Sequence, residues 1–132
     1  MIKIPEGRRY SSRHIWIEMD DEFIGRCGIT EECLADLGYI SFVDFPEVNM
    51  EIRAGEKVAR LESDIDLIDL PAPVSGVIAE INSELETSPT TINRDPYGDG
   101  WIYRVEVKEP VEFLDLMDQN EYDDFLISGG DI

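Results

Sequence analysis

Residues 55–76 read GEKVARLESDIDLIDLPAPVSG, and this stretch decides the fold. Val58 to Leu61 and Ile65 to Leu70 are short runs rich in valine, isoleucine and leucine, which favour strands. Acidic and small residues separate the two runs, and prolines followed by a serine and a glycine come after them, which is typical of turns. The stretch therefore predicts a β-hairpin with Glu62 to Asp66 at its tip.

The regions on either side of this hairpin also predict short strands. Aromatic and β-branched residues are frequent in them, and turn residues such as Asp20-Asp21 and Pro46 separate them. Short strands at this spacing are typical of a small sandwich or a flattened barrel. The further strands expected are Ile15 to Met19, Glu22 to Cys27, Tyr39 to Phe45, Val77 to Ile81 and Tyr103 to Val107.

Three short helices are expected between and after the strands. Thr30 is a suitable N-cap because two glutamates follow it in the first turn, and Gly38 stops that helix. A second helix begins at Pro110 and continues through Met117, because apolar residues repeat there three positions apart. Asn120 is expected to cap the third helix.

The length and composition indicate one folded domain, residues 1–132. A chain of 132 residues with 42% hydrophobic side chains is long enough to bury a core. No apolar run approaches the roughly 20 residues that cross a bilayer, and Met1 to Arg9 lacks the features of a signal peptide. We therefore expect a cytoplasmic protein without a membrane segment, with Ser128 to Ile132 as a frayed tail.

The net charge narrows the choice of partners. The chain has 30 Asp and Glu against 11 Lys and Arg, a formal charge of −19. Nucleic acids and anionic membranes are excluded as partners, because proteins bind both through lysines and arginines. The acidity serves either solubility or electrostatic steering toward a basic protein, and composition alone leaves both possibilities open.

The residues that most often carry catalysis or metals are few. Cys27 and Cys33 are too few for a four-ligand zinc site, and we interpret them as small reduced apolar residues. His14, the only histidine, stands beside Trp16 on a predicted strand, where a structural role is favoured over a general base. The segment Asp95 to Trp101 is interpreted as a turn that pins Trp101 into the barrel. We therefore predict no enzyme activity and no metal site.

A series of short motifs runs along most of the chain. They are Tyr10 with His14-Ile15-Trp16, Gly28-Ile29-Thr30, Leu37 to Val43 followed by Pro46, Gly55-Glu56, Glu62-Ser63, Asp69-Leu70, Pro73-Val74-Ser75-Gly76, Asn82, Asn93, Asp95 to Trp101, and Tyr122 with Phe125-Leu126. Each motif alone is unspecific, whereas their order and spacing are specific. Taken together, over residues 10 to 127, they resemble the H protein of the glycine cleavage system.

The resemblance implies both a fold and a function. The fold would be mainly β with short flanking α-helices, a hybrid barrel-sandwich of the lipoyl/biotinyl-carrier type with two small antiparallel sheets. Proteins of this family hold lipoate on a lysine at the tip of an exposed hairpin. The lipoyl group visits the glycine cleavage enzymes in turn, so the H protein is a shuttle substrate and not a catalyst.

Our sequence departs from the family at the attachment lysine. In the family this lysine lies three residues after the Glu of Glu-Ser and eight before the Pro of Pro-Val-Ser-Gly. Here Glu62 and Pro73 are eleven residues apart, so both counts end on Ile65. Asp69-Leu70 matches the family between the two anchors, which excludes a slip of one residue.

An isoleucine cannot accept lipoate, because the amide bond to lipoate needs a lysine amine. Lys57 precedes position 65 by eight residues, and the other two lysines, Lys3 and Lys108, lie outside the hairpin. We therefore expect no cofactor on this chain.

Three interpretations of the tip remain open. The tip is a solvated hairpin end without a role, or it is a docking site in which Glu62, Asp64, Asp66 and Asp69 surround an apolar contact at Ile65. A metal site at the three aspartates is the third interpretation, although the glycine and distal glutamate of a calcium loop are absent.

The leading functional hypothesis is an interaction or regulatory protein that binds other proteins, namely glycine cleavage components or lipoate-attachment enzymes. The alternative is a working carrier in glycine cleavage, or in another one-carbon or sulfur-transfer pathway, that uses a different attachment or a noncovalent group. A relic without a retained role is a third possibility.

Overall fold

The computed structural model describes residues 7–129. The expectations for the first six residues, including Lys3, and for the tail from Gly130 lie outside the described residues. The strands are β1 (Arg8–Tyr10), β2 (Ile15–Met19), β3 (Ile24–Ile29), β4 (Ile40–Asp44), β5 (Glu51–Ile52), β6 (Lys57–Ser63), β7 (Leu67–Pro71), β8 (Gly76–Ile81) and β9 (Tyr103–Val107). The helices are α1 (Glu31–Leu37), η1 (Ser83–Glu86), α2 (Thr91–Arg94), α3 (Pro110–Leu114) and α4 (Gln119–Ile127).

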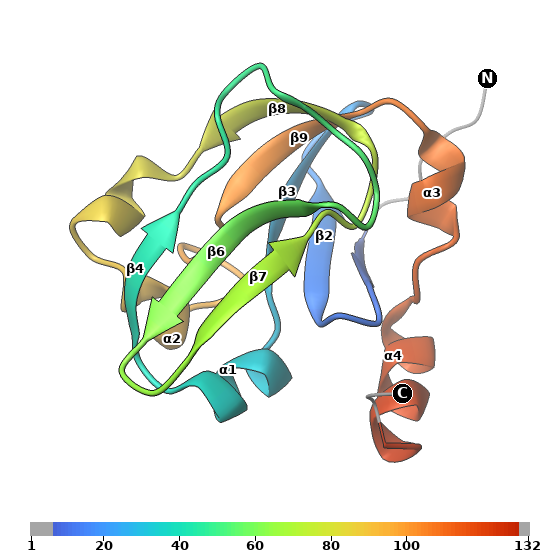
Figure 1. The fold of residues 1–132 in the computed structure, drawn as a ribbon. Coiled ribbons are helices and arrows are strands. Elements are labelled where there is room, and N and C mark those ends of the chain that lie inside the picture. The colour runs from blue at the N-terminus through green and yellow to red at the C-terminus, as the bar shows by residue number, and fades with distance from the viewer. Residues whose placement is uncertain (1–6, 130–132) are drawn as a thin grey trace.

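The strands form two antiparallel sheets with short helices around them (Figure 1). One sheet has the order β1-β2-β3-β9-β8-β5, and the other has the order β4-β6-β7. The sequence predicted this mainly β architecture and all of the longer strands. It missed β1 and β5, which have three and two residues, because such short strands carry no readable alternation.

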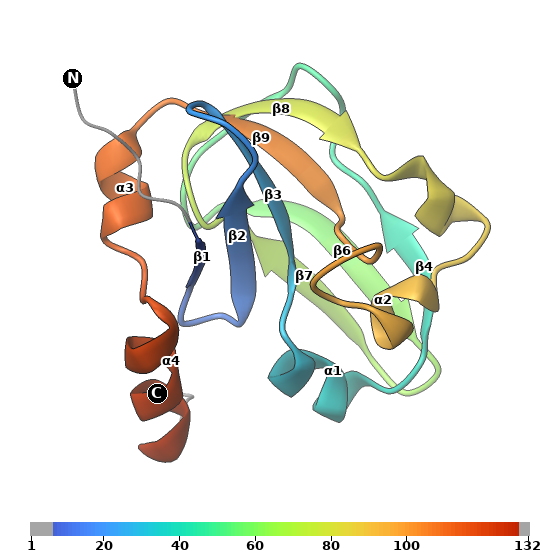
Figure 2. The ribbon, with the colours of Figure 1, turned by 180° about the vertical axis from the view of Figure 1, so that it is seen from behind.

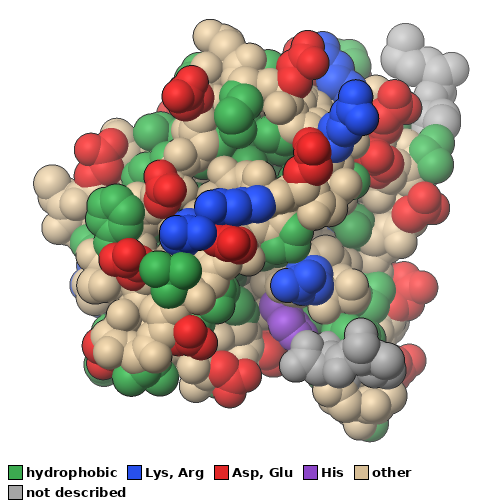
Figure 3. Space-filling model, viewed as in Figure 1, with side chains coloured by type: hydrophobic (Ala, Val, Ile, Leu, Met, Phe, Trp, Pro, Cys, Tyr) green, Lys and Arg blue, Asp and Glu red, His purple; other side chains and the backbone are tan. Residues whose placement is uncertain are grey.

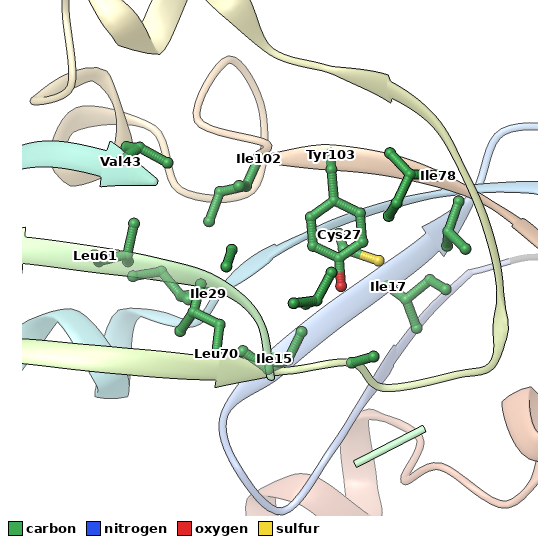
Figure 4. Packing of buried hydrophobic residues seen from close by; sticks show 14 of the residues in the cluster. Ile15, Ile17, Cys27, Ile29, Val43, Leu61, Leu70, Ile78, Ile102 and Tyr103 are labelled. Carbon is green, nitrogen blue, oxygen red and sulfur yellow. The ribbon is translucent and has the colours of Figure 1, made fainter. Parts of the chain in front are cut away.

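The main core lies between the two sheets (Figure 4). Alternate residues of β2 and of β9 point into it, as the period of two in a strand requires. Ile17 of β2 and Leu61 of β6 are fully buried, and each such side chain contributes roughly 1.5 to 3 kcal/mol through its burial. The other members that Figure 4 labels are Ile15, Cys27, Ile29, Val43, Leu70, Ile78, Ile102 and Tyr103.

A second cluster lies outside the main core and fastens α4 to the sheet. Trp16, between two core residues on β2, joins Tyr10 and Tyr122 in this cluster. The rings of Tyr10 and Tyr122 are stacked with centroids 4.5 Å apart. The Tyr122 hydroxyl hydrogen-bonds with His14 Nδ1 at 2.7 Å and with Thr30 Oγ1 at 2.9 Å. His14 thus connects the β1–β2 turn to α4, which is the structural role expected for it.

The boundaries of the C-terminal helices differ from the prediction. Helix α3 stops at Leu114, and Met117 forms a β-bridge with Tyr10, so the expected helical repeat through Met117 is wrong. Asp118, and not Asn120, caps α4: its carboxylate accepts from the Glu121 N–H at 2.9 Å, and the Glu121 carboxylate accepts from the Asp118 N–H. This reciprocal capping box satisfies two helix donors at once, an advantage that Asn120 lacks.

The turn before β9 buries Ile102 in the core, and not Trp101 as expected. The Asp95 carbonyl accepts from the N–H groups of Gly98 and Gly100, which closes the turn. Ile102 is fully buried in the main core, whereas Trp101 is half-buried beside the second cluster. The Arg104 guanidinium lies 4.2 Å from the centre of the Trp101 ring. The turn therefore places Trp101 on the surface of the barrel and not inside it.

Candidate functional site

The predicted hairpin tip is a four-residue turn, Ser63 to Asp66, which we call the tip loop. It joins β6 to β7 at the edge of the molecule, next to the connection from α1 to β4 (Figures 1 and 2). The Ser63 N–H donates to the Asp66 carbonyl at 2.8 Å and closes the turn. The expected start of the second strand at Ile65 is therefore wrong, because β7 begins only at Leu67.

The Ser63 hydroxyl gives the tip loop its shape. Its oxygen accepts from the N–H groups of Ile65 and Asp66 at 3.2 and 3.0 Å. A serine that binds the backbone two and three residues ahead is a common device of tight turns. The loop also contains no residue with a positive φ, so any L-amino acid fits its backbone.

Ile65 projects from the tip loop into solvent with 71% of its surface exposed. Asp64 and Asp66 on either side are exposed as well. The expected arrangement of an apolar side chain flanked by carboxylates is therefore present. No side chain of the tip loop carries an amine, and a hydrocarbon side chain at position 65 does not fit the chemistry of amide attachment.

The tip loop is supported by the segment that follows α1, which sequence reasoning missed. The Asp64 N–H donates to the Tyr39 carbonyl at 3.3 Å. The Asn93 side chain of α2 accepts from the Ile40 N–H and donates to the Gly38 carbonyl, both at 2.9 Å. These bonds join residues more than 20 positions apart, so no local pattern reveals them. The position of the tip therefore depends on α1 and α2 as well as on its own hairpin.

Two features of position 38 explain why a glycine stands beside the tip loop. Its φ of 79° and ψ of −157° lie in a region that only glycine adopts readily. A Cβ added there would lie 2.7 Å from Asp64 Oδ1. We expect Gly38→Ala to lower the free energy of unfolding by about 2 kcal/mol, measured by urea denaturation. Gly55→Ala is the control, because Gly55 has a φ of 89° but no neighbour within 4 Å.

A double-mutant cycle separates the cost of backbone strain at Gly38 from the cost of the contact with Asp64. In an Asp64→Ala background the Gly38→Ala substitution should cost about 0.5 to 1 kcal/mol less, because the carboxylate that it meets is gone. If the two substitutions were strictly additive, the proposed packing of the tip loop on Gly38 would be wrong.

The remaining predicted site residues occupy the outward face of the hairpin. Glu62 is half-buried on β6, and Asp69 is exposed on β7. Asp69 is engaged by cations: the Arg60 Nε lies 2.8 Å and the Lys57 Nζ 3.5 Å from its Oδ1. The hydrogen bond from Arg60 holds the pKa of Asp69 below its ordinary value. Asp69 is therefore a predicted carboxylate that is hydrogen-bonded to a cation of its own chain.

The lysines that the structure describes lie far from the tip. Lys57 pairs with Pro71 at the opposite end of the hairpin. Lys108 follows β9, where its N–H donates to the Ser75 carbonyl, and its Nζ lies 2.7 Å from Glu106. Neither amine is placed where the tip loop would present it.

Other kinds of site find little support in residues 7–129. They contain no group of three or more His, Cys, Asp or Glu side chains placed to hold a metal ion, so the three aspartates considered above do not converge. Burial raises the pKa of Cys27 to about 12 and that of Cys33 to about 11, so both thiols are protonated at neutral pH. None of the helices described here is long and apolar enough to cross a bilayer.

Comparison with known protein families gives a consistent result. A family model described as Glycine cleavage H-protein matches residues 8–128. A glycine cleavage system H protein of Coxiella burnetii is 40% identical over 122 residues, which are 92% of this chain and 94% of the relative. The H protein of Coprothermobacter proteolyticus is 42% identical over 126 residues, 95% and 98% of the two chains.

A solved structure shows the same fold. The crystal structure of a glycine cleavage system H protein from Mycobacterium marinum matches this structure with a TM-score of 0.79 and 36% sequence identity. The match covers 96% of this chain and 99% of the other. The likeness therefore extends over both sheets and the surrounding helices.

Proposed function

Because the chain belongs to the glycine cleavage H-protein family, we propose that it is a member whose tip binds other proteins and carries no lipoyl group at position 65. It would act as a non-catalytic interaction or regulatory protein. Its partners would be glycine cleavage components or the enzymes that attach lipoate. We also propose that residues 1–132 act as one domain.

The observation that carries this proposal is the chemistry of the tip loop. The two sequence anchors of the hairpin place the attachment position of the family at Ile65, which is exposed at the tip and offers no nucleophile. The fold around it is retained over nearly the whole chain. A protein that keeps the shape of the carrier without its attachment point is suited to bind the carrier's partners.

The acidic surface supports a binding role. Within residues 7–129, no lysine or arginine lies within 4 Å of the carboxylates of Glu62, Asp64 or Asp66. Unpaired carboxylates around an exposed apolar side chain favour a basic partner, because the charges select it and speed the encounter.

Binding to purified proteins tests this proposal. Each glycine cleavage component and each lipoate-attachment enzyme of the same organism would be titrated with the chain by isothermal calorimetry. We expect at least one of them to bind, and Ile65→Ser to weaken that binding more than Ile127→Ser. Ile127 is an equally apolar, exposed residue on α4 and serves as the control. If none of these proteins bound, the proposed role would be wrong.

The alternative of a working carrier makes a different prediction. It requires a covalent group at another residue, or a small molecule that remains with the protein during purification. Mass spectrometry under denaturing and native conditions distinguishes the two forms. A bare chain under both conditions would contradict the carrier hypothesis.

A further inference from the structure

Exposed hydrophobic side chains gather around the tip loop. Of the ten large hydrophobic side chains that are exposed among the described residues, four lie there: Tyr39, Phe42, Ile65 and Leu67. We call these four the apolar patch. Only Ile65 among them was a predicted site residue. Scattered exposed hydrophobic residues are ordinary, whereas a contiguous group points to an interaction site.

Strand register brings the patch together on the outer face of the three-stranded sheet. Phe42 of β4 and Leu67 of β7 both pair with Glu62 of β6, so the three side chains form one row across the sheet. The next row inward along β6 is centred on Leu61, which is fully buried, so the row of Glu62 points outward. The Tyr39 backbone lies beside the tip loop, because its carbonyl accepts from the Asp64 N–H.

Carboxylates surround the apolar patch. Asp64 and Asp66 flank Ile65, Glu62 lies between Phe42 and Leu67, and Asp44 follows on β4. Figure 3 shows this face of the molecule, with hydrophobic and acidic side chains around a run of Lys and Arg in its middle and further Lys and Arg toward the right. Arg60 and Lys57 on this face contact Asp69, and Arg60 also lies opposite Asp44 in the strand register and acts electrostatically on Glu62. Among residues 7–129, Asp64 and Asp66 have no lysine or arginine within 4 Å.

A hollow of about 380 Å³ adjoins the patch at Phe42. Its apolar side chains are Phe42 and Val43 of β4, Phe45 just after β4, and Leu85 of η1. Asp44 and Glu86, both exposed, contribute carboxylates to it. A lining of apolar side chains and two carboxylates suits the side chain of a lysine or arginine, whose stem is apolar and whose end is cationic.

We infer that the apolar patch and this hollow form one docking surface for a basic segment of another protein. The segment would place an apolar side chain against Phe42, Ile65 and Leu67. A lysine or arginine of the same segment would enter the hollow between Asp44 and Glu86. This inference rests on the proposed function, and it adds where on the chain the partner binds and what the partner carries.

Charge decides between this occupant and a second copy of the chain. Two copies would bring like charges together at the patch, and each chain carries a net charge of −19. A basic segment instead neutralises the carboxylates of Asp64 and Asp66, which have no lysine or arginine within 4 Å among residues 7–129. The apolar centre then supplies affinity as in other interfaces. A dimer that formed through this face would contradict the inference, and sedimentation would detect it.

Matched substitutions test the surface on the purified partners named above. Phe42 and Phe23 are 53% and 55% exposed and lie at different ends of the molecule. We expect Phe42→Ala to weaken binding about tenfold or more, and Phe23→Ala less than about twofold. A thermal midpoint close to that of the wild type would show that both variants fold.

Two double variants of equal charge test the contribution of the carboxylates to binding. Asp64→Asn with Asp66→Asn should weaken binding and reduce its dependence on salt, because two carboxylates of the surface are lost. Asp123→Asn with Asp124→Asn removes the same charge from exposed positions on α4 and should change little. Equal effects of the two pairs would mean that charge acts over the whole molecule and not at this surface.

The outcomes separate the inference from the proposed function. If a partner binds and Ile65→Ser weakens it while Phe42→Ala does not, the larger docking surface is wrong and the proposed function stands. If no partner binds, the proposed function fails, and a synthetic peptide of alternating leucine and lysine still tests the surface by NMR. Shifts confined to the apolar patch, Asp44 and Glu86 would support it, and shifts scattered over other acidic faces would overturn it.

Discussion

Ile65→Lys is expected to accept a lipoyl group when lipoate and a lipoate-attachment enzyme are supplied. The tip loop already stands at the end of an exposed hairpin, and none of its residues has a positive φ, so a lysine fits its backbone. Intact mass spectrometry would show the addition of one lipoyl group. The wild-type chain in the same reaction should keep its unmodified mass.

Three control variants make this prediction specific. Ile127→Lys introduces an equally accessible amine on α4, where 85% of the isoleucine surface is exposed, and it should remain unmodified. Asp64→Lys and Asp66→Lys move the amine by one residue and should react about a hundredfold more slowly, because misplacing a reacting group is costly. If one of them reacted faster than Ile65→Lys, the alignment of position 65 with the attachment lysine would be wrong.

Gly76→Ala is expected to destabilise the fold more than an alanine at any other glycine within residues 7–129. Gly76 begins β8 and pairs with Val107 of β9. A Cβ at this position would lie 2.0 Å from the carbonyl oxygen of Glu106, which belongs to the backbone of β9 and cannot rotate away. The two strands would have to separate. We expect a loss of about 3 kcal/mol or more in the free energy of unfolding.

Urea denaturation measures this loss, and Gly55→Ala serves again as the control because it adds a methyl group without a neighbour. For a chain of this size, a loss of 3 kcal/mol moves the midpoint by roughly 1 to 2 M urea. A midpoint no lower than that of Gly55→Ala would mean that β8 and β9 adjust freely around the new side chain.

The elements that the sequence predicted well are those whose signals are local. Thr30 and Gly38 bound α1 as expected, since the Thr30 side chain accepts from the Cys33 N–H and Gly38 has a positive φ. The hairpin of β2 and β3 formed because alternate residues such as Ile15 and Ile17 fill one core. In each case the residues that decide the structure are close together in the chain.

The elements that the sequence predicted poorly depend on distant partners. Met117 continues a helical spacing, yet it pairs with Tyr10, which lies 107 positions earlier. Asp118 and Asn120 are both good caps, and only the bond back from Glu121 decides between them.

The candidate site also has a part that the sequence predicted and a part that it did not. Counting from two anchors located position 65 at the tip, and the structure places Ile65 there, exposed. The convergence of Tyr39, Phe42 and Leu67 on the same end of the sheet depends on the register between β4, β6 and β7 and on the Asn93 side chain. Neither of these is visible in a single sequence without its fold.

We propose that this member of the glycine cleavage H-protein family carries no lipoyl group. The most direct test is the intact mass of the chain purified from its own organism after growth with lipoate, beside Ile65→Lys produced in the same cells. We predict the mass of the unmodified chain for the wild type and an added lipoyl group for the variant. A lipoyl group on the wild-type chain, at any residue, would contradict the claim.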